Sequence, residues 1–298
     1  MSVIVGPTAA GKSAIALHVA EATGAVLVSA DSRQVYRGFD IGTAKPTADE
    51  RRRVPHRGLD VAAPTDRWHA ARWAEAARGW IADARAAGQP VLVVGGTGLW
   101  VRALAEPLFN EPALDADARA ALAAELAPLD TEVLRARVRT LDPARAHLGR
   151  AQLLRAIEVA TLAGVPQSVL MAEPPAAPAL PLRYLVVDPG PVLRERIAER
   201  TAAMLRNGWV DEVASLRATV PPEAPAWHAT GYDVVAEVVA GTRSVASARD
   251  AIVIATRQYA KRQRTWNRHQ LPAARVQHLS PDLSQARAHA LAWFQESS

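Results

Sequence analysis

Short apolar runs alternate with longer segments of helical periodicity along the first third of the chain. The apolar runs at 3–5, 25–30 and 90–94 have the length and the two-sided hydrophobicity of buried strands. Helical patterns at 13–23 and 68–87 lie between these runs. Buried strands that alternate with helices are typical of a parallel sheet covered on both faces. The pattern therefore predicts an α/β fold.

The pattern changes after Glu106, where the strand signals stop. The stretch 106–181 is rich in Ala, Leu, Arg and Glu, and it ends in a Pro/Ala linker that cannot continue a helix. Strands are expected again at 184–188 and, last in the chain, at 275–279. We therefore predict a helical insertion in the α/β core. The expected bounds are 1–108 and 181–298 for the core, and 109–180 for the insertion domain.

The composition adds a hint about partners and removes some kinds of chemistry. The chain has 298 residues, 49% of them hydrophobic, which is enough for a sizeable core. It contains no cysteine, so disulfides, thiolate metal sites and a cysteine nucleophile are excluded. A formal net charge of +5 is a weak sign of a polyanionic partner. Because we find no signal peptide and no apolar run of membrane-spanning length, we expect a cytoplasmic protein without membrane contact, and we predict no protein partner.

A phosphate-binding motif follows the first expected strand. Its spacing is that of the Walker A motif, and it lies between a strand and a helix, as a P-loop does. The residues of the motif are Gly6, Pro7, Thr8, Ala9, Ala10, Gly11, Lys12 and Ser13. Backbone N–H groups, the helix N-terminus and Lys12 suit phosphate oxygens, and the Ser13 hydroxyl suits Mg²⁺. The fold class is therefore expected to be a P-loop-type α/β sheet, although hydrolysis, phosphoryl transfer and other pyrophosphate chemistry all remain open.

The loops after the next strands narrow this choice. The run 91–94 ends in Gly95 and Gly96 without the acidic Mg²⁺ ligand expected of an ordinary ATPase. Asp31 follows the run 25–30 at the sheet edge where ligands bind, and it is either a general base or a cap of the following turn. Thr97 lies at the same edge. The glycine pair before it is explained equally well by close packing of a helix against the strand end. The loop 38–46 is too rich in glycine and polar residues to be core, and its simplest interpretation is a surface connection.

A helix expected at 247–268 carries basic residues on one face. Arg257, Lys261, Arg264 and Arg268 are spaced by four, three and four residues. Such a face is either solvated or a track for nucleic-acid phosphates. Trp266 on the same helix is either a core residue or a platform for base stacking.

The combination of motifs resembles one family. The stretches that carry the resemblance are GPTAAGKS at 6–13, DSRQVYRGFDIGTAKP at 31–46, GGTGL at 95–99 and TRQYAKRQRTW at 256–266. Weaker matches at 153–159 and at Gly231–Tyr232 follow in the family's order. The chain resembles the tRNA dimethylallyltransferases, the bacterial isopentenyl-tRNA transferases, over almost its full length.

The resemblance implies a reaction and roles for residues. A dimethylallyl group would pass from dimethylallyl diphosphate to N6 of the adenosine at position 37, next to the anticodon of tRNA, and pyrophosphate would leave. By similarity, the P-loop residues hold the diphosphate, Mg²⁺ assists with Ser13 as a ligand, and the catalytic residues are Asp31 as base, Thr97 and Arg200. The resemblance places tRNA contacts at Asp31, Ser32, Arg33, Gln34, Arg155, Arg257, Lys261 and Arg264.

The chain departs from the family pattern in places. The segment 147–152 lacks the Pro-Asn-Asp pattern of the family, which puts a tRNA contact of the insertion in doubt. Trp100 stands where tyrosine is common. The main alternative is a P-loop small-molecule kinase that uses ATP, which predicts a second acidic Mg²⁺ ligand and a nucleobase pocket. A non-catalytic RNA-binding module is a further alternative, and it leaves the P-loop without a role.

Overall fold

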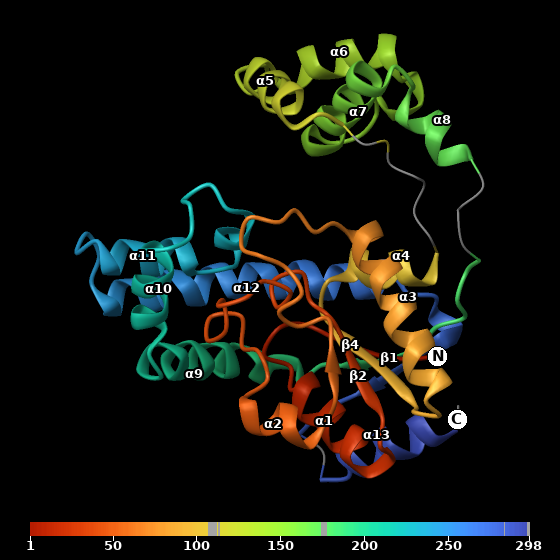
Figure 1. The fold of residues 1–298 in the computed structure, drawn as a ribbon, viewed down its shortest axis with the longest axis vertical. Helices are drawn as coiled ribbons and strands as arrows, with labels where there is room; N and C mark the ends of the chain where they lie inside the picture. Colours follow the sequence, from red (N-terminus) through yellow and green to blue (C-terminus); the bar gives the residue numbers. More distant parts are fainter. Residues whose placement is uncertain (107–111, 113, 174–177, 283, 297–298) are drawn as a thin grey trace. The chain divides into compact units, whose positions relative to one another are not determined.

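The computed structural model describes residues 1–106, 112, 114–173, 178–282 and 284–296 (Figure 1). The chain divides into two compact units, of which one combines Met1–Ala105 with Ala179–Ser298 and the other is Glu106–Pro178. The first unit contains the sheet, and the second is helical where it is described. Each unit is described by itself below.

The first unit is built on a six-stranded sheet with the strand order β3-β2-β4-β1-β5-β6, in which every pairing is parallel. The strands are β1 (Ser2–Val5), β2 (Val26–Ala30), β3 (His56–Arg57), β4 (Val91–Gly95), β5 (Arg183–Val187) and β6 (Val276–Leu279). The prediction of a parallel P-loop-type sheet is confirmed, and its expected strands lie within a residue of the observed ones. Only the short edge strand β3 was missed, because two residues carry no periodicity.

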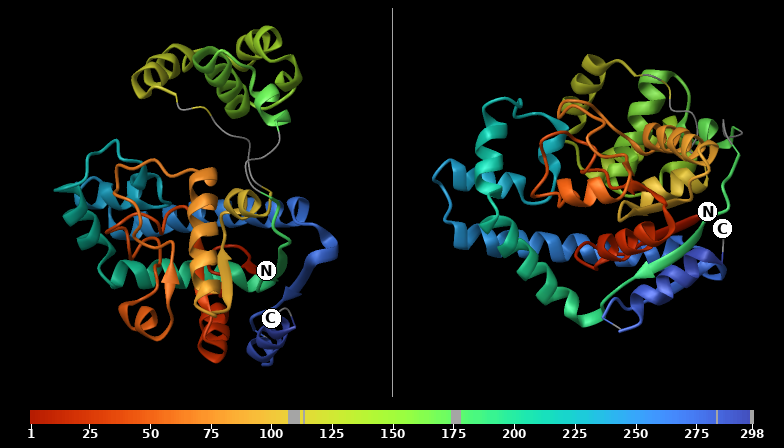
Figure 2. Two further views of the ribbon diagram at one scale, coloured as in Figure 1. Left: turned by 45° about the vertical axis from the view of Figure 1, so that its right-hand side comes forward. Right: turned by 60° about the horizontal axis from the view of Figure 1, so that its bottom comes forward.

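Helices cover both faces of the sheet (Figures 1 and 2). The helices of this unit are α1 (Lys12–Thr23), α2 (Ala48–Arg53), α3 (Ala70–Ala86), α4 (Gly98–Ala105), α9 (Leu193–Arg206), α10 (Trp209–Arg217), α11 (Tyr232–Val239), α12 (Val245–Gln270) and α13 (Ala286–Gln295). Right-handed crossovers place α1 and α3 on opposite faces, because the strand order runs outward from β1 to β2 and returns from β2 to β4. Helix α12 is long and packs beside α9 and α4.

The main core lies between the sheet and the pair α1 and α13. Leu92 and Leu185 from the strands pack with Ile15 of α1 and with Trp293 and Phe294 of α13, and all are almost fully buried. Alternate strand residues turn to this face because the side chains of a strand alternate between its two sides. In this arrangement the carboxyl ends of β1, β2 and β4 meet at one edge, and their loops face each other there.

The second unit is a small helical bundle with its own apolar core. Its helices are α5 (Ala116–Leu126), α6 (Thr131–Leu141), α7 (Arg150–Ala163) and α8 (Gln167–Ala172). Asp115 and Asp130 cap α5 and α6 by accepting hydrogen bonds from backbone N–H groups. The buried residues of this core are Leu122, Leu126, Leu134, Val138, Leu153, Ala156 and Ile157. Leucines at helical spacing on three helices explain why the segment packs as a unit.

Of the described residues, none belongs to a helix that is both long and apolar enough to cross a bilayer.

Candidate active site

The P-loop follows β1 and leads into α1. Gly6 has φ 151, and a Cβ on it would lie 2.1 Å from the carbonyl oxygen of Val187, so only glycine fits beside the end of β5. Gly11 has φ 91, and the non-glycine Ala9 has φ 61 at the crest of the loop. Left-handed backbone at both positions turns the chain tightly around the space before the α1 N-terminus, where an anion is favoured.

Lys12 lies within the curve of the P-loop and is half-buried. Its Nζ donates to the carbonyl oxygen of Pro7 at 2.7 Å. Burial and, to a smaller extent, the positive charge of Arg200 lower the pKa of Lys12 to about 8, although the Asp31 carboxylate opposes both effects. The lysine therefore lies in a site with more positive charge than the protein itself neutralises, as a phosphate site requires.

Asp31 lies directly after β2, and its Oδ1 accepts the backbone N–H of Arg33 at 2.9 Å. The capping role expected as an alternative is therefore present. The same carboxylate also acts electrostatically on Lys12, Arg200 and Tyr259, so it faces the P-loop side of the site. Since a carboxylate has two oxygens, the cap at Oδ1 leaves Oδ2 for other contacts.

Thr97 connects the loop after β4 to the loop after β2. Its Oγ1 accepts the backbone N–H of Ser32 at 3.0 Å, and its own backbone N–H donates to the carbonyl oxygen of Ala30 at 3.2 Å. Its hydroxyl also bonds the hydroxyl of Tyr259 on α12. Burial and the Asp31 charge raise the pKa of Tyr259 to about 12. The sequence does not single out Tyr259, because a tyrosine in an amphipathic helix gives no sign of what it faces.

The arginines of α9 differ in their partners. Arg200 is half-buried beside Lys12 and Asp31, and burial lowers its pKa while Asp31 opposes this. Arg196 forms an ion pair with Asp282 and donates to the carbonyl oxygen of Ala10 at 3.4 Å, on the outer side of the P-loop. The structure thus brings Arg200, rather than Arg196, together with the charged groups of the site.

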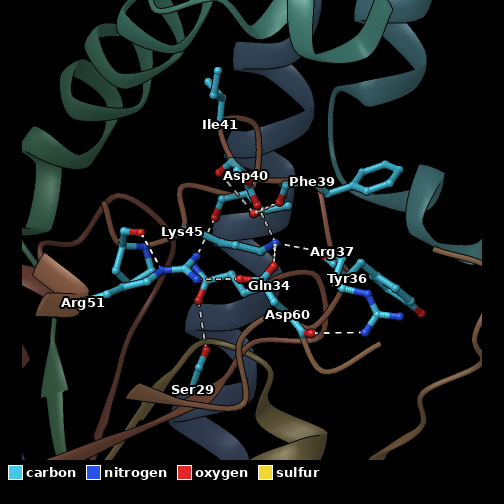
Figure 3. A network of polar contacts seen from close by, with 12 residues as sticks. Ser29, Gln34, Tyr36, Arg37, Phe39, Asp40, Ile41, Lys45, Arg51 and Asp60 are labelled. Carbon is cyan, nitrogen blue, oxygen red and sulfur yellow. Dashed lines mark hydrogen bonds and ion pairs between the residues drawn. The ribbon is translucent and has the colours of Figure 1, made fainter. Parts of the chain in front are cut away.

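The loop 38–46 is not the surface connection that we expected. Phe39 is fully buried and packs edge-to-face on Trp227 and at a tilted angle on Tyr232, and Lys45 is 8% exposed. Lys45 Nζ donates to Asp40 Oδ1 at 2.6 Å and to Asp60 Oδ1 at 2.5 Å, as Figure 3 shows. Glycine and polar residues suggested exposure, but Lys45 is paired both with Asp40 of the same loop and with the more distant Asp60, which the local sequence does not reveal.

The contacts of Lys45 with Asp40 and Asp60 are extended by residues of α2 and α10. Arg51 of α2 bonds the second oxygen of Asp60 at 2.5 Å, and Glu212 of α10 accepts the backbone N–H groups of Asp40 and Ile41 at 3.0 and 2.6 Å. The Tyr232 hydroxyl donates to the other oxygen of Glu212. A cavity of about 550 Å³ lies along this loop. Its lining includes Ile41, Ala44, Lys45, Arg51, Arg200 and Met204.

The expected tRNA contacts after Asp31 have partners within the protein. Gln34 donates to the carbonyl oxygens of Thr43 and Ala44 at 3.1 Å and accepts from the Ser29 hydroxyl at 2.9 Å (Figure 3). Arg33 donates to the carbonyl oxygen of Pro225 at 3.3 Å. Because both the oxygen and the nitrogen of its amide are hydrogen-bonded within the protein, the Gln34 side chain supports the loop around Asp31. The sequence alone does not indicate this role.

The basic residues of α12 fall into different groups. Arg257 and Lys261 are exposed. Arg264 is half-buried, and it bonds both oxygens of Asp188 at 2.8 and 2.5 Å and the carbonyl oxygen of Gly190 at 2.7 Å. These bonds attach α12 to the end of β5. Trp266 lies against Gly98, where a Cβ would be 2.2 Å from the ring, so its position favours packing over stacking with bases.

In the helical unit, the structure gives partners to the expected arginine and to the altered segment. Arg155 forms an ion pair with Glu158, which also pairs with Arg119, and these bonds hold the pKa of Glu158 below its usual value in spite of burial. In the segment 147–152, Arg150 donates to the carbonyl oxygens of Leu129 and Ala127 at 2.5 and 2.9 Å. This segment therefore closes the C-terminal end of α5.

Ser13 is the expected metal ligand, and its side chain is exposed in the first turn of α1. A hydroxyl at this place suits a hard cation that is held mainly by the oxygens of a bound phosphate group. Among the described residues there is no group of three or more histidine or acidic side chains arranged to hold a metal ion by themselves. The residues present therefore fit an ion that comes with its anionic ligand.

The parallel sheet, the P-loop after β1 and the carboxylate after β2, the next strand along the chain, define a P-loop α/β protein. The family model described as IPP transferase matches residues 34–270, and the model described as Isopentenyl transferase matches residues 1–57. A tRNA dimethylallyltransferase from Deinococcus radiodurans is 43% identical over 97% of this chain and 95% of its own length. The chain belongs to the tRNA dimethylallyltransferase family.

Solved structures agree with this assignment. A tRNA Δ(2)-isopentenylpyrophosphate transferase from Staphylococcus epidermidis matches with a TM-score of 0.67 at 28% identity, covering all of this chain and 99% of that one. A eukaryotic dimethylallyltransferase acting on tRNA has the same fold, with a TM-score of 0.78 at 23% identity over 98% of this chain and 77% of that one. The alternative of a small-molecule kinase is not favoured.

Proposed function

We propose that this protein transfers the dimethylallyl group from dimethylallyl diphosphate to N6 of the adenosine at position 37 of tRNA, giving N6-dimethylallyladenosine and pyrophosphate. The observation that carries the proposal is that Asp31 lies close enough to Lys12 and Arg200 to interact with their charges, at the carboxyl ends of the strands where the P-loop also lies. Asp31 can then act as the base for the amine, while Lys12 and Arg200 stabilise the departing diphosphate. Membership of the family supports the reaction type.

In this proposal the P-loop binds the diphosphate. Backbone amides at the N-terminus of α1 bind the phosphate oxygens, and Lys12 and Arg200 neutralise the charge that grows as the allylic C–O bond breaks. Because both cations are already partly desolvated, they need little reorganisation when the charge develops. Mg²⁺ held by Ser13 and the diphosphate would supply further positive charge to the leaving group.

Asp31 acts on the acceptor. The lone pair of the exocyclic amine is delocalised into the adenine ring, so the amine is a weak nucleophile. Asp31 takes the N6 proton as the new C–N bond forms, while the electron pair of the C–O bond leaves with pyrophosphate. Asp31 also accepts the Arg33 N–H, and Thr97 holds the neighbouring Ser32 N–H, so the loop presents the carboxylate in one orientation.

The tRNA would meet the exposed cations of α12. Arg257 and Lys261 are suited to the phosphate backbone, because both are exposed and on one face of the helix. Position 37 lies in a single-stranded loop, so the adenine can be turned into the site at a smaller unstacking cost than in a duplex. We expect the helical unit to contact the anticodon stem-loop.

The experiment is incubation of the protein with labelled dimethylallyl diphosphate, Mg²⁺ and unmodified tRNA. We expect label on a single adenosine of the anticodon loop and release of pyrophosphate. A tRNA with guanosine at position 37 is the matched control and should stay unlabelled. Absence of label from the RNA, with ATP consumed on a metabolite, would refute the proposal.

A further inference from the structure

Gln263 is a buried polar residue of α12 that the mechanism above does not use. The residue is 7% exposed, and its side chain reaches the active-site edge of the sheet from the side of α12. Its Oε1 accepts the backbone N–H of Thr8 at 2.8 Å, and its Nε2 donates to the carbonyl oxygen of Gly96 at 2.9 Å. A single amide thus links the P-loop to the loop that carries Thr97.

The backbone of Gly96 approaches the Gln263 amide closely. A Cβ on Gly96 would lie 2.3 Å from Gln263 Nε2, so glycine at this position permits the contact. One turn earlier on α12, Ala260 is buried in a cluster with Leu193 and Ile197, against which Ala9 of the P-loop packs. Two adjacent residues at the crest of the P-loop, Thr8 and Ala9, are therefore supported by α12.

The crest needs this support for a physical reason. Ala9 adopts φ 61, a conformation that is unfavourable for residues other than glycine and persists only where neighbouring contacts maintain it. The amides that follow Ala9 are those that we expect to bind the diphosphate. Loss of the bond to Thr8 would let the crest relax, and the amides would then pay an ordering cost on binding.

We propose that Gln263 is a positioning residue for diphosphate binding, and that it holds the P-loop in its binding conformation from the helix that carries the tRNA-binding cations. This inference rests on the proposed function, in which the P-loop takes the diphosphate. Gln263 itself does not touch the diphosphate or the reacting atoms. It acts through the Thr8 amide and, by way of Gly96, through the loop of Thr97.

The test uses Gln263→Met, which keeps the side-chain length and loses both hydrogen bonds. Calorimetric titration of the folded variant with pyrophosphate and Mg²⁺, without tRNA, should give a Kd about tenfold above that of the wild type. The tRNA affinity should stay within about twofold. The control is Gln258→Met, an equal change at an exposed position of α12, which should leave both affinities unchanged.

A second variant leaves α12 intact. Gly96→Ala places a Cβ where the Gln263 amide lies, and it should weaken pyrophosphate to a similar extent. An unchanged pyrophosphate Kd in both variants would overturn the inference. An equal loss of pyrophosphate and tRNA affinity would also overturn it, because Gln263 would then only hold α12 in place. If Gln263→Met does not fold, Gly96→Ala decides by the same criteria.

Kinetics separate this inference from the proposed function. In Gln263→Met the KM for dimethylallyl diphosphate should rise more than kcat falls. If the wild type binds pyrophosphate but transfers nothing to tRNA, the proposed function fails while the role of Gln263 remains testable by titration. If the wild type transfers the group and the variant binds pyrophosphate normally, only the inference fails.

Discussion

The protein contains two partly enclosed lysines at the same sheet edge, and their surroundings differ. Lys45 lies in the loop after β2 with a side chain 1% exposed, and Asp40 and Asp60 both bond its Nζ. Lys12 lies in the P-loop, where its Nζ bonds only a carbonyl oxygen among the described contacts and its strongest charged neighbour is another cation, Arg200. Lys45 is neutralised by two aspartates, whereas Lys12 has no ion pair with an acidic side chain among the described contacts.

This difference separates a structural charge from a functional one. A buried charge that is fully paired stabilises the conformation around it and needs no ligand. A buried charge with a lowered pKa costs stability in the free protein, and a ligand of opposite charge recovers that cost on binding. The predictions that follow test this contrast, in order of decreasing effect.

The largest effect is expected at the carboxylate that faces Lys12. Asp31→Asn keeps an oxygen for the Arg33 N–H but removes the base, so the rate of transfer should fall by about 10²–10⁴-fold in single-turnover measurements. Affinity for tRNA should stay close to that of the wild type. Asp31→Ala removes the cap as well. If Asn restores full activity where Ala does not, Asp31 is only a cap.

The next effect is the pH dependence of ligand binding at Lys12. The pKa of Lys12 is about 8 in the empty site, so above pH 8 the free protein loses the charge that pyrophosphate needs. The Kd for pyrophosphate should therefore rise by up to about tenfold per pH unit above pH 8, whereas well below pH 8 Lys12 stays charged and adds no pH dependence to this Kd. Titration of Lys12→Arg across the same range is the control, because arginine stays charged and shares any titration of the ligand. Parallel pH profiles for both proteins would contradict the prediction.

A moderate effect on stability is expected at the paired lysine. Lys45→Met leaves Asp40 and Asp60 without their shared cation, and should lower the free energy of unfolding by about 1–3 kcal/mol, since both carboxylates are partly exposed. Urea denaturation measures it. Lys12→Met is the matched comparison and should not lower stability at pH 7, because it removes a desolvated charge beside Arg200. A larger loss from Lys12→Met would reverse the contrast.

The smallest effect is expected on tRNA binding by α12. This helix also contains an exposed arginine, Arg257, and a paired one, Arg264. Arg257→Gln should weaken tRNA binding a few-fold and flatten the dependence of log K on log salt by about one unit. Arg264→Gln removes a cation that is bonded to Asp188, so it should reduce stability and leave the salt slope almost unchanged. Filter binding at several salt concentrations measures both. A steeper change from Arg264 would make it the tRNA contact.

Much of the fold could be predicted because its signals are local. Apolar runs and helical periods located the parallel strands, and the spacing from Gly6 to Ser13 located the P-loop, since a tight turn before a helix needs glycines at set positions. The loop around Lys45 could not be predicted in the same way. Its partners Asp60 and Glu212 are distant in sequence, and a glycine-rich polar stretch has the same composition whether it is exposed or internally paired.

The sequence by itself determined the sheet, the P-loop and the residue types of the chemistry, because each depends on neighbours along the chain. Only the tertiary structure decided which of these residues face one another. It placed Arg200 beside Lys12, engaged Gln34 and Arg264 within the protein, and set Gln263 under the P-loop crest. The reason is physical. Whether a polar side chain stabilises the fold or binds a ligand depends on which groups lie beside it in the folded protein, and periodicity along the chain does not indicate those neighbours.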